Sequence, residues 1–419
     1  MNRQITYLIC ICASLLPSCD TEKNIEPRYN SYFVKYYGGQ GSQTGRQVKE
    51  TSDGGYIIVG TDDHAPQSTG TKDILLVKVD AIGNQQWIKT YDGLTNADDE
   101  GMSVIEVNGG YVVAGNTNVG SGAEKILLTK VDQFGEIISE IELGEAGYST
   151  TCSNISLGLS GILVTGATTK TLTDDLTNNL DIYYSRVELD LSSHVSKVFG
   201  GQREDFGIKA FEDNLGQLVI FGNSDNKAAE KDGFLISHIF TTVIEDTILS
   251  TGGVNYAGSL GTNEYCYDVT ETNFGYAAIG HTFDEASSKY NLFIAQVAFI
   301  DGSYQNIRAY PILDDNNIEG TGIAASQDGG YIIAGKITKS GNTNIYLAIT
   351  DHLGAIKKDN TGTFNVTRTF GDSFDDGDGY VLQGIDGSIL LTGTINLESQ
   401  TKIVLIKTGP NLEMSNSEM

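Results

Sequence analysis

Clusters of carboxylates are the residues of this chain whose types and spacing could do chemistry. They recur just ahead of short apolar runs, at Asp98-Asp99-Glu100, Glu204-Asp205, Glu264, Glu319, and Asp372 with Asp375-Asp376-Gly377-Asp378. Like charges held close together raise one another's pKa or recruit a cation. If the fold gathers these groups, we expect a rim that binds a cation, with calcium as the candidate, or a basic group of a partner. The residues assigned to this rim are Asp98, Asp99, Glu100, Glu204, Asp205, Glu319, Asp375, Asp376 and Asp378.

Two other interpretations of the same carboxylates stay open. Each Asp could cap its own turn by accepting hydrogen bonds from backbone amides, as Asp commonly does. Alternatively, two carboxyl groups from different clusters could flank a glycosidic bond, and their separation would then decide how it is hydrolysed. That separation depends on how the fold brings distant segments together.

Other catalytic constellations are missing from the sequence. The five histidines fall at unrelated positions of the repeat described below, and no pair of them has the spacing of a metal site. Gly120-Ser121-Gly122 lies in a polar stretch and does not form a nucleophile elbow between a strand and a helix. We therefore assign no catalytic residue and expect a binding or scaffolding protein, with an exported carbohydrate-active hydrolase or lyase as the alternative.

A repeat must position these residues. An apolar run ending in Gly recurs at Gly60, Gly115, Gly166, Gly222, Gly280, Gly335 and Gly393, at intervals of 55, 51, 56, 58, 55 and 58 residues. Apolar residues make up 39% of the chain and Gly occupies 50 positions, which favours short strands and tight turns. One period from end to end predicts a single array of seven units.

Each unit contains four expected strands. In the first unit they cover about 45–51, 56–61, 73–80 and 84–91. Asp53-Gly54-Gly55 supplies turn chemistry between the first two, and Asp80-Ala81-Ile82-Gly83 does so between the last two. The third strands, such as Ile74-Leu75-Leu76-Val77, are continuous apolar runs that suit sheets packed on both faces. The aromatic residues that recur at one register are expected to pack between units.

One strand stands alone at the front of the array. Tyr32-Phe33-Val34-Lys35-Tyr36-Tyr37-Gly38-Gly39 is similar to Gln86-Trp87-Ile88-Lys89-Thr90-Tyr91-Asp92-Gly93, an outermost strand, whereas the seventh unit stops near Thr408 without one. We therefore expect an all-β fold, a seven-bladed β-propeller of four-stranded antiparallel blades, closed by residues 32–37 completing the last blade. The propeller is expected to span 31–409, and residues 410–419 to form a flexible tail.

The two faces of such a ring should differ. Tight turns join first to second and third to fourth strands on one face, whereas the other face receives longer, polar connections such as 62–72 and 168–179. Binding residues concentrate on long loops held by a rigid scaffold. We expect a protein or glycan partner on this long-loop face.

The first residues form a targeting segment. Arg3 is followed by the apolar stretch from Ile5 to Leu16 and by Leu15-Leu16-Pro17-Ser18-Cys19, which resembles a bacterial lipobox. This resemblance implies a lipoprotein signal peptide at 1–18, a lipidated Cys19 and a linker at 19–30. The acidic residues after Cys19 resemble a surface-export tag, so we expect a lipid-anchored protein of the outer membrane, at the cell surface. An ordinary secretory signal with an incidental Cys is the alternative.

Charge and cysteine usage agree with export. The formal net charge is -27, and losing Arg3 with the signal makes it -28, so nucleic acid is excluded as a partner. Cys152 and Cys266 lie in units three and five, at the slot that Gly45, Gly101, Gly207 and Gly320 fill elsewhere. A disulfide needs Cα atoms within about 7 Å, so we expect two buried free thiols.

The repeat itself resembles a known group. The first unit, with Asp53-Gly54-Gly55-Tyr56-Ile57-Ile58-Val59-Gly60 and Asp73-Ile74-Leu75-Leu76-Val77-Lys78-Val79-Asp80, is similar to the repeat of uncharacterised secreted β-propeller proteins common in Bacteroidetes. The similarity covers about Ser31 to Thr408 and blurs in units four and five. It implies a fold and an exported location, and it carries no site residue over to this chain.

Overall fold

The computed structural model describes residues 32–63, 72–93, 97–121, 123–159, 161–170, 179–200, 204–212, 217–224, 235–244, 247–249, 254–257, 263–273, 275–284, 288–298, 304–309, 317–359, 361–362 and 365–414. The predicted signal peptide at 1–18, Cys19 and the linker at 19–30 lie outside these residues. Regular secondary structure in the described ranges consists of β-strands. Within them, no helix long and apolar enough to cross a membrane occurs.

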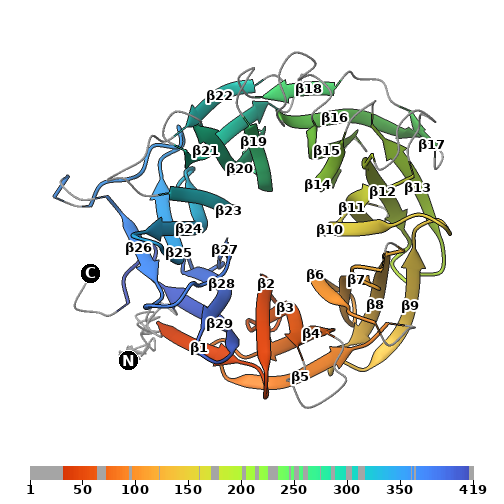
Figure 1. Ribbon diagram of the computed structural model, residues 1–419, viewed down its shortest axis with the longest axis horizontal. Coiled ribbons are helices and arrows are strands. Elements are labelled where there is room, and N and C mark those ends of the chain that lie inside the picture. Colours follow the sequence, from red (N-terminus) through yellow and green to blue (C-terminus); the bar gives the residue numbers. More distant parts are fainter. Residues whose placement is uncertain are drawn as a thin grey trace, which may run out of the picture.

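The strands form antiparallel sheets that follow one another around a central axis (Figure 1). The first two sheets contain β2 (Ser42–Glu50), β3 (Tyr56–Asp63), β4 (Lys72–Val79) and β5 (Gln85–Tyr91), then β6 (Glu100–Val107), β7 (Gly110–Thr117), β8 (Lys125–Asp132) and β9 (Ile137–Leu143). The next two contain β10 (Thr150–Leu157), β11 (Ile162–Thr168), β12 (Asp181–Val187) and β13 (His194–Phe199), then β14 (Asp205–Glu212), β15 (Gln217–Ser224), β16 (Leu235–Ile244), β17 (Thr247–Leu249) and β18 (Val254–Ala257).

The remaining sheets complete the ring. They contain β19 (Asn263–Glu271), β20 (Gly275–Asp284), β21 (Lys289–Ala298) and β22 (Tyr304–Ala309), then β23 (Asn317–Ala325), β24 (Tyr331–Lys339), β25 (Asn342–Thr350) and β26 (Thr367–Phe370), and finally β27 (Gly379–Gln383), β28 (Ile389–Asn396), β29 (Thr401–Thr408) and β1 (Phe33–Tyr37). In each sheet the strand listed first here lies nearest the axis in Figure 1. In the last sheet this innermost strand is β27, and β1, which comes first in the chain, is the outermost strand. The predicted all-β propeller with small antiparallel blades is confirmed.

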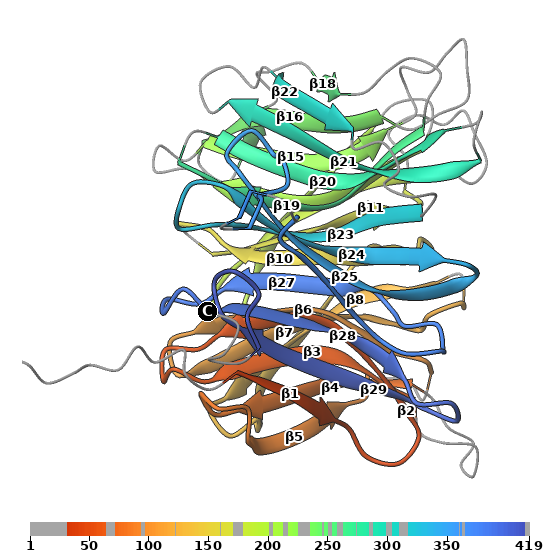
Figure 2. The ribbon, with the colours of Figure 1, turned by 90° about the vertical axis from the view of Figure 1, so that its left-hand side faces the viewer.

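The two ends of the described chain share one sheet. Strand β1 pairs antiparallel with β29, so that Phe33 lies opposite Lys407 and Tyr37 opposite Ile403. Figures 1 and 2 both show β1 beside β29 at the junction of the red and blue ends of the chain. The predicted closure by the solitary N-terminal strand is therefore confirmed, and it covers the sheet edge that β29 would otherwise expose.

The tight turns have the chemistry that the sequence predicts. Gly54 has a φ of +80°, which L side chains rarely adopt, and Asp53 Oδ1 accepts a 2.9 Å hydrogen bond from Gly55 N. In the turn between β4 and β5, Asp80 Oδ1 accepts hydrogen bonds from the amides of Ile82 and Asn84 at 3.0 and 2.8 Å. These Asp residues fix turns through their own backbone neighbours.

The core lies between neighbouring sheets. Ile57, Val59 and Leu76 of the first sheet pack against Val113 and Leu127 of the second, and all are at most 2% exposed. Burying one such side chain contributes about 1.5–3 kcal/mol before the entropy cost of folding is counted. Tyr56, Tyr111, Tyr276 and Tyr331, which recur at one register, are all buried and serve this packing, as expected.

Two details differ from expectation. The sheet that begins with β14 has five strands, because β17 and β18 pair with different halves of β16. The expected flexible tail at 410–419 needs correction over 410–414, since Leu412 is 2% exposed and packs into the core cluster that contains Val404 and Ile406. Residues 415–419 lie outside the described residues. A turn closed by Leu412 N and Gly409 O at 3.0 Å directs this apolar side chain back onto the last sheet.

Candidate functional site

The innermost strands share one backbone feature, a pair of small residues opposite each other. Each places a Gly or Cys opposite the Gly of its neighbouring strand, and the pairs are Gly45–Gly60, Gly101–Gly115, Cys152–Gly166, Gly207–Gly222, Cys266–Gly280, Gly320–Gly335 and Gly379–Gly393. A β-bulge follows this pair in all of these innermost strands except β27. Small residues are needed because the strands approach closely: a Cβ on Gly101 would lie 2.1 Å from the carbonyl oxygen of Gly60. Bulges often redirect a side chain toward a functional site.

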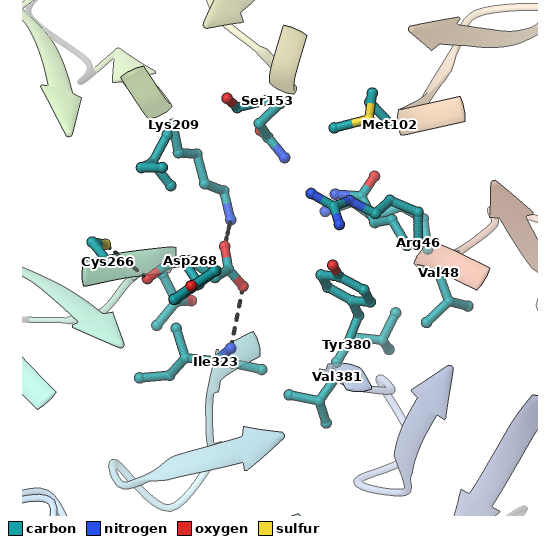
Figure 3. Close-up of a pocket in the computed structure, with 18 of the residues that line it drawn as sticks. Arg46, Val48, Met102, Ser153, Lys209, Cys266, Asp268, Ile323, Tyr380 and Val381 are labelled. Carbon is teal, nitrogen blue, oxygen red and sulfur yellow. Dashed lines mark hydrogen bonds and ion pairs between the residues drawn. The ribbon is translucent and has the colours of Figure 1, made fainter. Parts of the chain in front are cut away.

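The residues just after these pairs surround an axial cavity of about 570 Å³. Arg46, Met102, Ser153, Ile208 and Tyr267 each occupy the bulged position, and Tyr380 occupies the same position in β27; all six line the cavity. Figure 3 shows Arg46, Met102, Ser153 and Tyr380 around the open centre. A volume of this size is within the usual range of small-molecule sites, about 300–1,000 Å³.

Polar side chains at the next position connect neighbouring innermost strands. Gln47 Oε1 accepts hydrogen bonds from Ser103 Oγ at 3.0 Å and from Val104 N at 2.8 Å, on the following blade. Ser103 Oγ in turn accepts one from Ile155 N at 3.1 Å, a further blade along. These bonds fix the spacing of the blades around the cavity, so the side chains that line it are held on rigid strands.

Four charged residues of the described chain line the cavity: Arg46, Lys49, Lys209 and Asp268. Lys209 Nζ lies 3.0 Å from Asp268 Oδ1, and it also donates to Val269 O at 2.6 Å. Asp268 accepts two further bonds, from Val269 N at Oδ1 and from Ile323 N at Oδ2. The Arg46 guanidinium lies 5.3 Å from the centroid of the Tyr380 ring, at cation–π distance.

Burial shapes the electrostatics of this cavity. Burial and the neighbouring Lys209 charge together lower the pKa of Lys49 to about 8. Asp268 acts in the opposite direction. Burial also raises the pKa of Tyr267 to about 12, with Glu319 and Asp378 adding to the effect. Burial also raises the pKa of Tyr380. Both tyrosines are therefore neutral hydrogen-bonding groups at physiological pH.

Four of the predicted rim carboxylates accept hydrogen bonds from backbone amides, most of them in neighbouring strands. Asp99 is fully buried and accepts hydrogen bonds from Gly93 N at 2.6 Å and Asn118 N at 3.2 Å. Asp376, at the corresponding place in the last blade, accepts one from Asn396 N at 2.9 Å. Burial raises the pKa of both carboxyl groups. Asp98 and Asp375 accept from Lys72 N and Thr343 N at 3.0 and 2.8 Å.

Among the other rim residues, Asp378, Glu100 and Glu319 each have one ionisable contact partner, and Asp378 also raises the pKa of Glu319. Asp378 pairs with Lys336 at 2.7 Å, Glu100 with Lys72 at 3.5 Å, and the Glu319 carboxylate lies 3.7 Å from His281 Nδ1. Asp205 is buried and Glu204 is half-buried beside it. Within the described residues, no group of three or more His, Cys, Asp or Glu side chains could hold a metal ion. None of the nine rim residues lines the axial cavity. The Asp residues accept hydrogen bonds from backbone amides, as the capping alternative expects, but most of these amides lie in neighbouring strands and only Gly93 N lies in the same link as its Asp.

The two thiols are free and buried, as predicted. Burial raises the pKa of Cys152 to about 12 and also raises that of Cys266. The backbone amide of each Cys donates a hydrogen bond to an Asn on the preceding blade. Cys152 N donates to Asn116 Oδ1 at 2.6 Å, and Cys266 N donates to Asn223 Oδ1 at 2.8 Å. They are inert packing residues.

The axial cavity is the site that sequence reasoning missed. Its charged residues come from three different units, and none belongs to a short motif. One signal was present: the residue after each recurring Gly or Cys of the first strand varies among charged, polar, aliphatic and aromatic types, at Arg46, Met102, Ser153, Ile208, Tyr267, Thr321 and Tyr380. A slot that varies inside a repeat that otherwise recurs indicates residues chosen for something other than the scaffold.

Comparisons with known proteins extend to the fold alone. No protein-family model matches the chain, and no curated protein matches it. A protein of unknown function from Dyadobacter fermentans superimposes with a TM-score of 0.52 at 10% identity, over 90% of this chain and 97% of that one. The β-propeller domain of the Trilobed protease from Pyrococcus furiosus gives 0.45 at 12% identity, over 89% and 97% of the two chains. Pyrococcus horikoshii acylaminoacyl peptidase gives 0.47 at 11% identity, over 90% of this chain and 53% of that chain.

Proposed function

We propose that this protein is a non-catalytic binding propeller of seven blades, one for each hydrogen-bonded sheet, and that its ligand occupies the axial cavity. The single observation that carries this proposal is the bulged slot. Six side chains of five different types project from one equivalent backbone position into one cavity of about 570 Å³. Uniform scaffolding with a varied lining is the arrangement expected of a specific binding site.

The chemistry of the lining favours binding over turnover. Asp268, the one carboxylate among the described lining residues, already accepts three hydrogen bonds, so it is poorly placed to take a proton from a substrate. Cys266 lines the cavity with a raised pKa, which leaves it protonated and unreactive. The described lining residues include no His or Glu, and Lys49, with a pKa of about 8, is mainly protonated at pH 7.

One observation favours the second candidate, a carbohydrate-active hydrolase or lyase. The carboxyl group of Glu319 has a pKa raised by burial and by nearby Asp378, as a general acid requires, although Lys336 opposes the shift. This function predicts glycan turnover that Glu319→Gln abolishes while the thermal midpoint is unchanged. A turnover rate equal in the variant and the native chain would remove this candidate.

Export as a lipoprotein completes the proposal. Cys19 would carry the lipid, and the linker at 19–30 would let the propeller present its long-loop face to a membrane protein or glycan partner. Cys19→Ala is expected to move the protein from the outer-membrane fraction to the soluble fraction. A pull-down from detergent-solubilised membranes should then recover a stoichiometric partner with the native chain, and recovery of none would argue against a scaffolding role.

Filling the cavity tests the central claim. Ser153→Trp places an indole in the cavity, and Ile385→Trp, at a residue that is 87% exposed in the turn between β27 and β28 and does not line the cavity, is the matched control. A library of small polar compounds is screened by thermal shift against the native chain. Ligands that stabilise the native chain and the control should fail to stabilise Ser153→Trp. Ligands that stabilise all three equally would place binding outside the axial cavity and refute the proposal.

A further inference from the structure

We infer that the axial cavity binds a small organic anion, held by Arg46 and Lys49 of strand β2. This inference rests on the proposed function and names its ligand class. The chain as a whole has a formal charge of -27, yet the charged residues of the described chain that line this cavity are three cations and one carboxylate. The cavity is thus a local reversal of the protein's charge, which packing of the scaffold alone does not require.

The one carboxylate does not neutralise all three cations. Asp268 is fully engaged by Lys209 and by the amides of Val269 and Ile323. In the part of the chain that the structure describes, no ion pair joins Arg46 or Lys49 to an acidic side chain. Two positive charges from one strand therefore line the cavity without an ion-pair partner among the described residues, although Asp268 offsets Lys49 in part. A cation held away from bulk water is stabilised by an anion.

Arg46 has the geometry of a recognition residue. It occupies the bulged position of β2, between Gly45 and Gln47, and its guanidinium extends toward the axis above Tyr380 (Figure 3). The planar guanidinium presents paired N–H donors that match carboxylate and phosphate oxygens. Stacking on the Tyr380 ring holds this plane in place and leaves the donor edge for a ligand.

The rest of the lining describes the body of the ligand. Apolar groups of Val48, Met102, Ile323, Tyr380 and Val381 surround the cations. An anionic head joined to a compact apolar or aromatic body would satisfy both surfaces, and about 570 Å³ accommodates a molecule of that kind.

The acidic exterior does not prevent this binding. At physiological ionic strength the Debye length is about 8 Å, so carboxylates on the outer strands are screened from a ligand inside the ring. The two cations act at contact distance in a partly desolvated cavity, where each charge counts for more. The rim carboxylate Asp378, which with Arg46 influences the pKa of Tyr380, is paired with Lys336 at 2.7 Å.

The test compares three molecules of one size and different charge. Calorimetry at millimolar concentration measures binding of benzoate, benzamide and benzylamine to the full chain. We expect benzoate to bind at least tenfold more tightly than benzamide, and benzylamine to bind most weakly. Arg46→Gln and Lys49→Gln should each weaken benzoate at least tenfold and leave benzamide unchanged. Lys89→Gln, the same charge change at an exposed ion pair of an outer strand, should leave all three affinities unchanged.

The outcomes separate the two claims. Benzamide binding as tightly as benzoate, lost in Ser153→Trp, would overturn the anion inference and leave the axial cavity as the binding site. Benzoate binding that Arg46→Gln and Lys49→Gln do not weaken would also overturn it. Failure of all three molecules to bind would overturn the inference as well, while the compound library described above still decides the proposed function. Inorganic phosphate binding that depends on Arg46 would support the inference with an anion lacking an apolar body.

Discussion

The Tyr37 hydroxyl donates a 2.8 Å hydrogen bond to the carbonyl oxygen of Gly83, across the boundary between the blade that closes the ring and the blade that follows it. The same contact recurs one blade further along, where Tyr91 donates to Gly135 O at 3.0 Å. Each Tyr is the last residue of an outermost strand, and each Gly ends a tight turn of the next blade. The closing junction therefore has the same contact as an ordinary junction inside the chain.

Tyr37→Phe is predicted to lower the free energy of unfolding by about 1–2 kcal/mol, because a buried carbonyl loses its donor. Urea denaturation measures the loss. Tyr91→Phe is the matched control and should cost the same amount. If Tyr91→Phe destabilises the protein and Tyr37→Phe does not, the ring is not closed by β1 in solution.

Asp268→Asn is predicted to destabilise the protein by about 1–3 kcal/mol. The substitution leaves Lys209 without its counter-ion, and because Asn has one side-chain oxygen, one of the two amides of Val269 and Ile323 loses its acceptor. The two side chains are 15% and 22% exposed, so solvent screens this pair only in part. Glu136→Gln breaks the exposed pair with Lys89 and should cost no more than about 0.5 kcal/mol. Equal losses in the two variants would show that the Lys209–Asp268 pair has no special role.

The scaffold was predictable because its signals are local. Asp53-Gly54-Gly55 specifies a turn wherever it occurs, and Tyr37 could be matched with Tyr91 because both end the same strand of the repeat. The cavity depends on two facts that are not local. A bulge after Gly45 or Gly207 redirects the next side chain, and innermost strands that are a whole unit apart in the sequence meet at one axis. Arg46 and Lys209 are far apart in the sequence, so their proximity is a property of ring closure.

The carboxylate rim is the opposite case. Asp99 and Asp376 stand at equivalent positions, which suggested that they converge on a shared ligand. The structure shows that their shared role is local: Asp99 accepts from Asn118 N and Asp376 from Asn396 N, each within its own blade. Recurrence in a repeat therefore indicates a scaffold role here, and departure from recurrence indicates the site. Cation binding at the rim remains a prediction, and calorimetric titration of calcium with no heat would dispose of it.

Cys152 and Cys266 are predicted to resist alkylation in the folded protein. Both are at most 2% exposed, and burial raises both pKa values, so almost no thiolate is present at pH 8. Iodoacetamide labelling followed by peptide mass spectrometry should find both residues unmodified in the native chain and fully modified in guanidinium. Rapid native labelling of Cys266, which borders the cavity, would show that solvent reaches this thiol and that the innermost strand opens.

Lys49→Met is predicted to stabilise the protein at pH 7, and the gain should shrink as the pH rises. The pKa of Lys49 falls from its usual 10.5 to about 8 in the folded chain, so between these values the unfolded chain binds more protons. The contribution of Lys49 to the free energy of unfolding therefore rises with pH through this window, and its full cost is present below about pH 8. We expect the variant to exceed the native chain by about 1–2 kcal/mol at pH 7, after screening at a half-buried site, and by much less at pH 10.

The difference between two chains isolates Lys49 from other titrating groups. Tyr and Cys residues also ionise above pH 9, but they are the same in both proteins, so their contributions cancel. Lys209 and Asp268, which act on Lys49 with opposite signs, remain in place as well. Lys89→Met is the control and should show no such dependence on pH. If the stability difference between Lys49→Met and the native chain stays constant from pH 7 to pH 10, Lys49 is solvated. The cavity would then lack one of the two cations on which anion binding depends.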